Sequence, residues 1–284
     1  MIRRHVGSEW WLITQHDHAL LAGALARHLG GVVTGLSGEA IEAISEHDAG
    51  WQPLHDEAPT LNARGQPLDV FETPIDLSLR IWRESSTLAM RSGEYAGLLV
   101  SLHSLGLSAH TAARALPPRA TSTADLKLQF DLNKFQHAEV EQQEHCRRKL
   151  GMRLDAPLTL GLATDSLDPA EQHLAFDFHW MQAMDRLSLD LCCTHPPFGS
   201  IGQVSSGPHS GVPLHLTVTR TGPASACVSP WPFASPRLAV TIPHRRIPAV
   251  ELPSDEALRR HYRAAAVEPL TLTIEPPGPL AATG

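Results

Sequence analysis

Segments with helical spacing in this sequence carry histidines and aspartates on faces that are otherwise apolar. Residues three, four and seven apart share a face of a helix. By this spacing the following residues lie among Leu, Ala, Ile, Met and Phe side chains: His18, His47, Asp48, His103 and Asp185. A buried polar group without a partner costs roughly 2–7 kcal/mol, so these side chains need one another or a shared cation. Imidazole and carboxylate together favour a divalent transition metal, here Mn, Fe, Zn or Ni.

The other histidines have less suitable neighbours. His137 and His145 lie one helical turn from charged residues, which is typical of a solvated face. His16 and His179 are ambiguous, because each has both polar and apolar neighbours. A single helical histidine with apolar neighbours is usually a satisfied core residue, so the prediction depends on the order of the whole set.

That order is a histidine on one helix, a His-Asp pair at the end of the next, and an aspartate on a late helix. It resembles the H…HD…D pattern of the HD superfamily of metal-dependent phosphohydrolases, over about residues 16–190. The resemblance implies a helical core with His18, His47, Asp48 and Asp185 as metal ligands. It also implies that Asp48 is catalytic, bridging the metal and the attacking water. His103 lies where some members place an extra histidine that completes a second metal site, so it is both a candidate ligand and a candidate catalytic residue.

A closer resemblance extends nearly from end to end. The phrases that carry it are ITQHDHALLAGALA, AISEHDAGW, YAGLLVSLHSLGL, MDRLSLDLCC and SPWPF. They look like an uncharacterised bacterial family, domain of unknown function 3891. That family has no assigned activity, so the resemblance supports a fold grouping rather than a reaction.

The function expected from these patterns is a metal-dependent hydrolase of the HD type, acting on a phosphate ester or nucleotide-like small molecule. Three arginines are candidates for neutralising phosphate charge: Arg80, Arg83 and Arg186. Trp51 is a candidate either for stacking on a ring or for anchoring the core. Metal affinity should weaken below pH ~6.5, where free imidazole protonates.

Two alternatives stay open. One is an HD-type di-iron oxygenase, which needs His103 and one more histidine, with His179 or His16 as the sources. The other is a non-catalytic sensor or scaffold with a structural metal, in which SPWPF at 229–233 would bind a partner or ligand.

Composition narrows the class of protein. The chain has 284 residues and a net charge of −7, which disfavours general nucleic-acid binding. We find no apolar run of ~18 residues and no signal peptide, so we expect no membrane partner and a cytoplasmic location. The four cysteines form no CxxC pair and are expected to be reduced. The oligomeric state is not indicated.

Periodicity predicts an α+β fold, with a mainly helical HD-like core and a small antiparallel β portion. Residues 1–195 would form the helical domain with an N-terminal β-hairpin. Residues 196–284 would form a β-rich portion packed on it, so that the two parts make one structural unit. The N-terminal strands are candidates to join that sheet. The irregular stretch 52–73 is long enough to act as a lid.

Overall fold

The computed structural model describes residues 1–52, 58–115, 122–155, 158, 160, 168–209 and 212–277, with side chains omitted at 114 and 115. Part of the predicted lid, including His55, lies outside the described residues. The first elements are β1 (Ile2–Val6), β2 (Glu9–Ile13), α1 (Gln15–Arg27), α2 (Gly38–Glu46), and two short 3-10 turns, η1 (Ala49–Trp51) and η2 (Val70–Glu72). Four longer helices follow: α4 (Ile75–Ala89), α5 (Glu94–Ala115), α6 (Thr123–Lys149) and α7 (Pro169–Cys192). The remaining elements are β3 (Ser200–Ser205), β4 (Pro213–Gly222), β5 (Ser225–Ser229), β6 (Leu238–Pro248), α8 (Asp255–Ala264) and β7 (Val267–Glu275).

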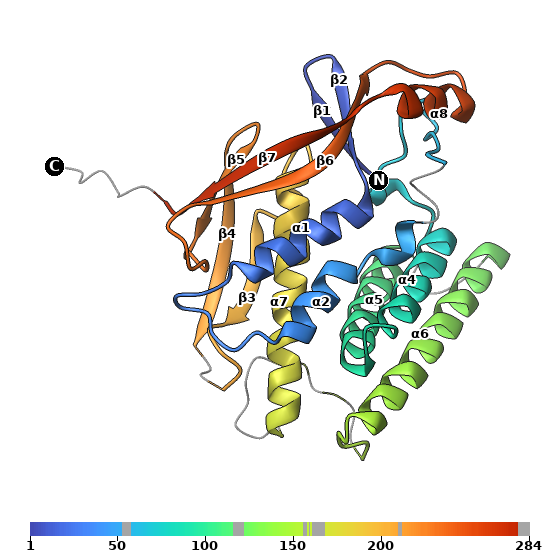
Figure 1. Ribbon diagram of the computed structural model, residues 1–284. Helices are drawn as coiled ribbons and strands as arrows, with labels where there is room; N and C mark the ends of the chain where they lie inside the picture. Colours follow the sequence, from blue (N-terminus) through green and yellow to red (C-terminus); the bar gives the residue numbers. More distant parts are fainter. Residues whose placement is uncertain are drawn as a thin grey trace.

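The strands form one seven-stranded sheet, in the order β1-β2-β6-β7-β5-β4-β3. Neighbouring strands are antiparallel except for β5 and β7, which are parallel. The N-terminal hairpin enters the sheet through β2, which pairs with β6 from Glu9↔Pro248 to Leu12↔Arg245. Strands from both ends of the chain therefore belong to the same sheet, which curls around α1 and α7 (Figure 1).

The predicted fold class is wrong. The chain is 50% helical and 22% strand, with a large mixed sheet curled into a half-barrel rather than a small β portion on an HD-like helical core. Strand β3 was not predicted, because Gly199 and Gly202 adopt positive φ and interrupt its alternation. Strand β6 runs through Pro243 and charged residues that resemble a loop, yet every second side chain is buried over most of its length.

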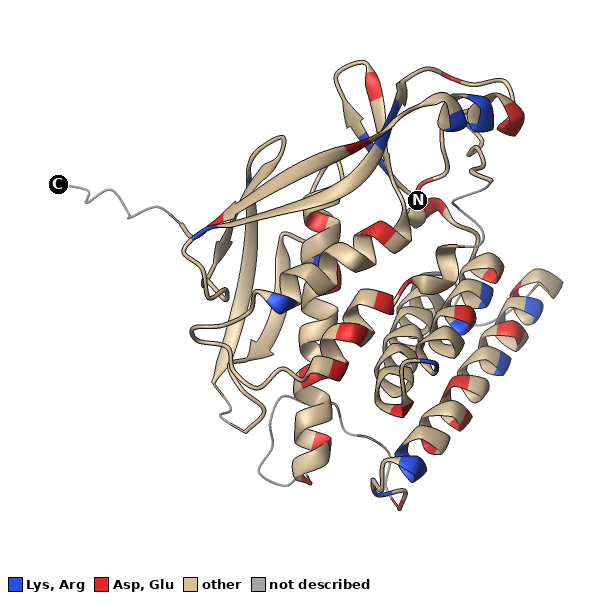
Figure 2. Ribbon diagram, viewed as in Figure 1, with Lys and Arg blue, Asp and Glu red and all other residues tan. Residues whose placement is uncertain are grey.

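The helices were predicted more accurately, because their caps and apolar periods are local signals. Ser37 is the N-cap of α2, and its hydroxyl accepts a hydrogen bond from the amide of Ala40 at 3.0 Å. Helices α4, α5 and α6 pack side by side (Figure 1). Acidic and basic residues alternate along the outer helix, α6 (Figure 2).

One buried cluster unites helices and sheet. Its members include Leu25 of α1, Trp180 of α7 and Ile274 of β7. The four cysteines are free, as predicted, and Cys146, Cys192 and Cys193 are buried. No helix in the described part of the chain is both long and apolar enough to cross a membrane.

Candidate metal centre

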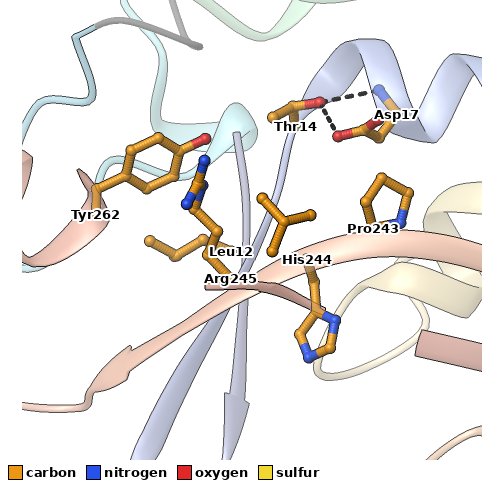
Figure 3. Close-up of a pocket in the computed structure, with 8 residues that line it drawn as sticks. Leu12, Thr14, Asp17, Pro243, His244, Arg245 and Tyr262 are labelled. Atoms are coloured by element: carbon orange, nitrogen blue, oxygen red, sulfur yellow. Dashed lines mark hydrogen bonds between the residues drawn. The ribbon is translucent and has the colours of Figure 1, made fainter. Parts of the chain in front are cut away.

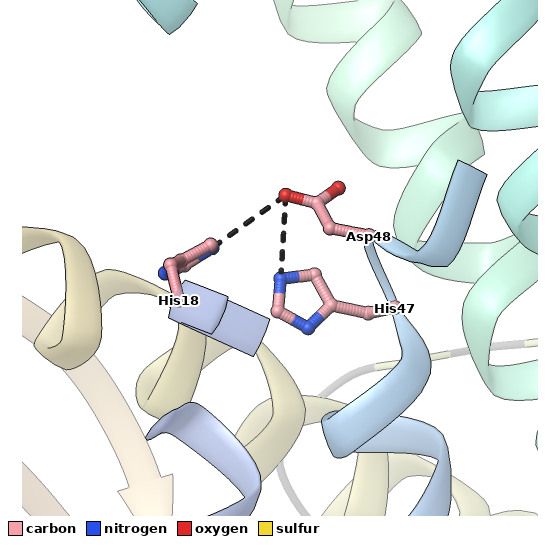
Figure 4. Close-up of side chains that lie close together, drawn as sticks. All are labelled: His18, His47 and Asp48. Atoms are coloured by element: carbon pink, nitrogen blue, oxygen red, sulfur yellow. Dashed lines mark ion pairs between the residues drawn. The ribbon is translucent and has the colours of Figure 1, made fainter. Parts of the chain in front are cut away.

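The helical elements bring the five predicted site residues together. His18 comes from α1, and His47 is the C-cap residue of α2, with Asp48 directly after it. His103 comes from α5 and Asp185 from α7. All five are buried, with residue exposures of 0% to 8%. Figure 4 shows His18 and His47 turned towards the carboxylate of Asp48.

The ring nitrogens of the histidines face carboxylate oxygens at short range. His18 Nε2 lies 3.5 Å from Asp48 Oδ2 and 3.2 Å from Asp185 Oδ1. His47 Nε2 lies 3.8 Å and 3.4 Å from the same two oxygens. His103 Nε2 lies 3.8 Å from Asp185 Oδ2. Charge-assisted hydrogen bonds between nitrogen and oxygen measure about 2.7–2.9 Å, so every one of these distances is longer.

Two of the imidazoles, those of His18 and His47, are hydrogen-bonded through Nδ1 and direct Nε2 towards the cluster. His47 Nδ1 donates to the carbonyl of Ile44 at 2.7 Å. The Ser188 hydroxyl donates to the carbonyl of Asp185 at 2.8 Å and therefore accepts the Nδ1 proton of His18 at 2.7 Å. In its neutral form each ring presents an unprotonated Nε2 to the cluster, and among the described residues neither Nε2 atom has a hydrogen-bond partner. This is how a partner beyond the ligands usually orients a metal-binding histidine.

Trp51 orients the carboxylate of Asp48. Its Nε1 donates to Asp48 Oδ1 at 3.1 Å, which leaves Oδ2 facing His18 and His47. Trp51 is 2% exposed, so it anchors the core and is not available for stacking on a ligand ring.

The charges in the cluster are strongly coupled. Burial opposes protonation of His47, but attraction to Asp48 and Asp185 outweighs it and raises the pKa of His47 to about 9. The pKa of Asp185 is held well below its usual value, because His18 and His47 outweigh the opposing effect of burial. Burial lowers the pKa of His103 to about 4, so this ring is neutral at pH 7. Without a metal, a proton on His47 would balance part of the carboxylate charge.

The arrangement fits a single cation. Within the described part of the chain, two groups of three side chains could hold a metal ion: His18, His47 and Asp48, and His47, His103 and Asp185. Bonds of about 2.0–2.2 Å place neighbouring ligand atoms roughly 3–3.5 Å apart, close to most of the measured separations. His47 belongs to both groups, but its Nδ1 is engaged, and the one lone pair on Nε2 cannot serve two ions. The shared histidine therefore favours one ion over two.

Other sequence candidates lie elsewhere. Arg83 pairs with Glu139 at 3.0 Å, and Arg186 donates to the carbonyl of Ile201. Arg80 is exposed. Neither His16 nor His179 belongs to the groups of described residues that could hold a metal.

The SPWPF segment has structural contacts. The carbonyl of Pro232 accepts the amide of Gly30, and the amide of Ala234 donates to the carbonyl of His28. Phe233 is 3% exposed. These contacts tie the end of α1 to the segment between β5 and β6.

Sequence reasoning missed the residues that orient the ligands. Ser188 lies one turn after Asp185 on the same face of α7, and a polar residue at that spacing was the available signal. Asp177 lies two turns before Asp185 and is also buried. It accepts hydroxyl hydrogen bonds from Ser37 and Tyr95, each at 2.8 Å.

Comparisons with known proteins leave the reaction open. No curated protein and no solved structure matches this chain. Residues 1–249 match the model of a family described as protein of unknown function (DUF3891), and the chain belongs to that family.

Proposed function

We propose that this protein is a metal-dependent hydrolase of the HD type that acts on a phosphate ester or nucleotide-like small molecule. The observation that carries the proposal is the pair of bare Nε2 atoms of His18 and His47, each within 3.5 Å of an Asp185 oxygen. The H…HD…D order of the resembled superfamily is matched by His18, the pair His47-Asp48 and Asp185. A divalent Mn, Fe, Zn or Ni ion would be held by His18, His47, Asp48 and Asp185, with His103 as a further ligand or neighbour.

The bound ion would supply Lewis acidity and lower the pKa of a water molecule towards ~7. The residues of the chain have separate tasks. Trp51 holds Oδ1 of Asp48, so that Oδ2 is directed to the centre. Burial lowers the pKa of His103 to about 4, so this ring is neutral at pH 7, and its Nε2, 3.8 Å from Asp185 Oδ2, can serve as a neutral ligand or neighbour of the ion.

The proposed substrate is small. The side chains of Asp48 and Asp185 are only 9% and 11% exposed, which suits a compact phosphoryl group better than a polymer surface. We propose no nucleic-acid or membrane partner, on the basis of the acidic net charge of −7. The cytoplasmic location stays a prediction.

The test combines metal analysis with activity. Purified protein should contain about one equivalent of transition metal by mass spectrometry, and a phosphatase and phosphodiesterase panel with Mn, Fe, Zn or Ni should give turnover. Asp48→Asn should abolish turnover, whereas Asp177→Asn, on a neighbouring part of the same core, should keep it. Equal activity of wild type and Asp48→Asn would refute the hydrolase. A silent panel with stoichiometric metal would instead favour a structural metal.

A further inference from the structure

A second polar site lies at the carboxyl end of α7. A pocket of about 640 Å³ is lined there by Arg4 and His5 of β1, Thr194 and His195 after α7, and Arg220 and Thr221 of β4. The curl of the sheet brings β1 and β4 to this end of the helix. The amide of His5 donates to Thr194 Oγ1 at 2.7 Å, which joins the first strand to the segment after α7.

Arg4 is buried and has no ionic partner among the residues that the structure describes. It is 2% exposed, and its only side-chain hydrogen bond to a described residue runs from Nη1 to the carbonyl of Leu191 at 3.3 Å. Its guanidinium also lies 5.6 Å from the ring centre of Trp11. A guanidinium has five N–H donors, so most of those of Arg4 are unused within the described chain. Burial and repulsion from Arg220 lower the pKa of Arg4 to about 10, which leaves it charged at pH 7.

Arg220 stands directly beside Arg4. Its Nη2 donates to the carbonyls of Leu191 and Cys193, each at 3.0 Å, and to that of Asp190. Both arginines thus donate to the same oxygen of Leu191. Two like charges at this range repel one another, and the partial charge of about −0.5 at a helix carboxyl end offsets only part of them.

Acidic side chains of the described residues do not neutralise the charges of Arg4 and Arg220. In the described ranges neither Arg4 nor Arg220 has a carboxylate oxygen within ion-pair distance. Asp190 attracts Arg220, but both of its oxygens accept backbone amides, from Phe198 and Gly199, at 2.9 Å. The excess positive charge faces a pocket whose rim adds His5, His195 and Thr221.

A smaller pocket of about 140 Å³ shows the opposite situation (Figure 3). Its arginine, Arg245, donates to the carbonyl of Ala265 and lies over the ring of Tyr262 at 4.9 Å. An acid, Asp17, lines the same pocket and accepts the Thr14 hydroxyl at 2.6 Å. Because side chains of both charge signs line this pocket, its arginine does not need a bound anion for charge balance.

We propose that the pocket at Arg4 and Arg220 binds the phosphoryl group of a small molecule, at a site separate from the metal centre. Two adjacent guanidinium groups match a dianion better than a singly charged carboxylate, and phosphate offers several acceptor oxygens for their unused donors. Thr221 and His195 at the rim are placed to contact the rest of the ligand. The proposal does not depend on hydrolase activity.

The test measures binding of inorganic phosphate and pyrophosphate to the full chain by calorimetry. Arg220→Lys keeps the charge but loses the planar fork, and we expect it and Arg4→Lys to weaken binding by about tenfold or more. Asp185→Asn, which disables the metal centre, should leave this binding unchanged. Arg237→Gln removes a surface arginine that pairs with Glu275, and it serves as the matched control. Acetate should bind much more weakly than phosphate.

Circular dichroism of each variant establishes that it is folded. Should Arg4→Lys fail to fold, His195→Gln on the exposed rim provides a second probe, with an expected loss of a few-fold in pyrophosphate binding. The proposal is overturned if wild type shows no saturable phosphate binding, since the arginines would then only cap α7. It is equally overturned if binding disappears in Asp185→Asn and persists in the arginine variants, or if acetate binds as well as phosphate.

Discussion

Two of the three buried aspartates of helix α7, Asp177 and Asp185, lie in contrasting surroundings. Asp177 Oδ2 accepts hydroxyl hydrogen bonds from Ser37 and Tyr95 at 2.8 Å. Asp185 Oδ1 instead faces the bare Nε2 atoms of His18 and His47 at 3.2 and 3.4 Å. Burial raises the pKa of Asp177 despite its donors, whereas the histidines hold the pKa of Asp185 well below the usual value.

The contrast shows that burial alone does not identify a ligand. Asp177 Oδ2 has two neutral donors at hydrogen-bond distance, which connect α7 with the start of α2 and with α5, and the half-buried His173 has its Nε2 3.5 Å from the same oxygen. Such an aspartate stabilises packing without a cation. Asp185 faces His18 Nε2 and His47 Nε2, which are hydrogen-bond acceptors when the rings are neutral. Because an acceptor cannot bond to another acceptor, this cluster needs a metal ion or additional protons.

Replacing each aspartate with asparagine should give the largest difference between the packing role of Asp177 and the proposed ligand role of Asp185. In Asp185→Asn the charged ligand is lost, and we expect metal content to fall to background. In Asp177→Asn the amide oxygen can still accept from Ser37 and Tyr95, so metal content should stay near that of wild type. Mass spectrometry of both purified variants gives the comparison. Equal metal loss in the two would mean that the cation depends on the packing of α7 in general.

Two serine hydroxyls, one beside the cluster at Asp185 and one that donates to Asp177, offer a second comparison. Ser188→Ala removes the acceptor that holds the His18 ring, and metal affinity should fall about 10- to 100-fold, as for other outer partners of ligands. Ser37→Ala removes the N-cap of α2 and a bond to Asp177, and should cost about 1 kcal/mol of unfolding free energy. Its metal affinity should not change. Competition with a chromogenic chelator measures the first effect, and urea unfolding the second.

The sequence predicted which histidines and aspartates lie close together better than it predicted the fold. His18, His47 and Asp185 were identified because helical spacing places each among apolar neighbours, a signal contained within one helix. Whether an aspartate on an apolar face meets donors or acceptors depends on other helices, so Asp177 could not be told apart from Asp185. Its hydroxyl partners, Ser37 and Tyr95, are distant in sequence.

The sheet was underestimated for a related reason. Pairing of β2 with β6 joins residues more than two hundred positions apart, and no local period reports it. Strand β6 contains Pro243 and two arginines, which resemble a loop when neighbouring strands are unknown. Local patterns were thus sufficient for helices, caps and inward-facing ligands, but not for the extent of the half-barrel.

The dependence of metal affinity on pH should sharpen the contrast further. In the metal-free protein His47 has a raised pKa of about 9, so metal binding at pH 7 must displace its proton. Affinity should therefore rise by about tenfold per pH unit from 7 towards 9, rather than level off near the usual histidine pKa of ~6.5. Chelator competition at several pH values measures this slope. A flat profile above pH 7 would show that His47 is already neutral.

The same shift affects stability without metal. Because the folded pKa of His47 lies above its unfolded value, its contribution is fully present below about pH 6.5 and is lost as pH rises through about 9. Thermal unfolding of chelated protein should therefore show a falling melting temperature between these values. The control Asp177→Asn should show the same fall, since His47 is intact in it.

The smallest effect is expected at Trp51. Trp51→Phe keeps a buried aromatic ring but removes the hydrogen bond from Nε1 to Asp48 Oδ1. One neutral donor is worth about 1 kcal/mol, so metal affinity should fall only about fivefold, and Asp48 should gain freedom to turn. Chelator competition at pH 7 measures the change against Trp180→Phe, which loses a comparable bond to Ser205 in the core beside the sheet. Equal losses in both variants would mean that Trp51 acts through packing, not through the carboxylate it holds.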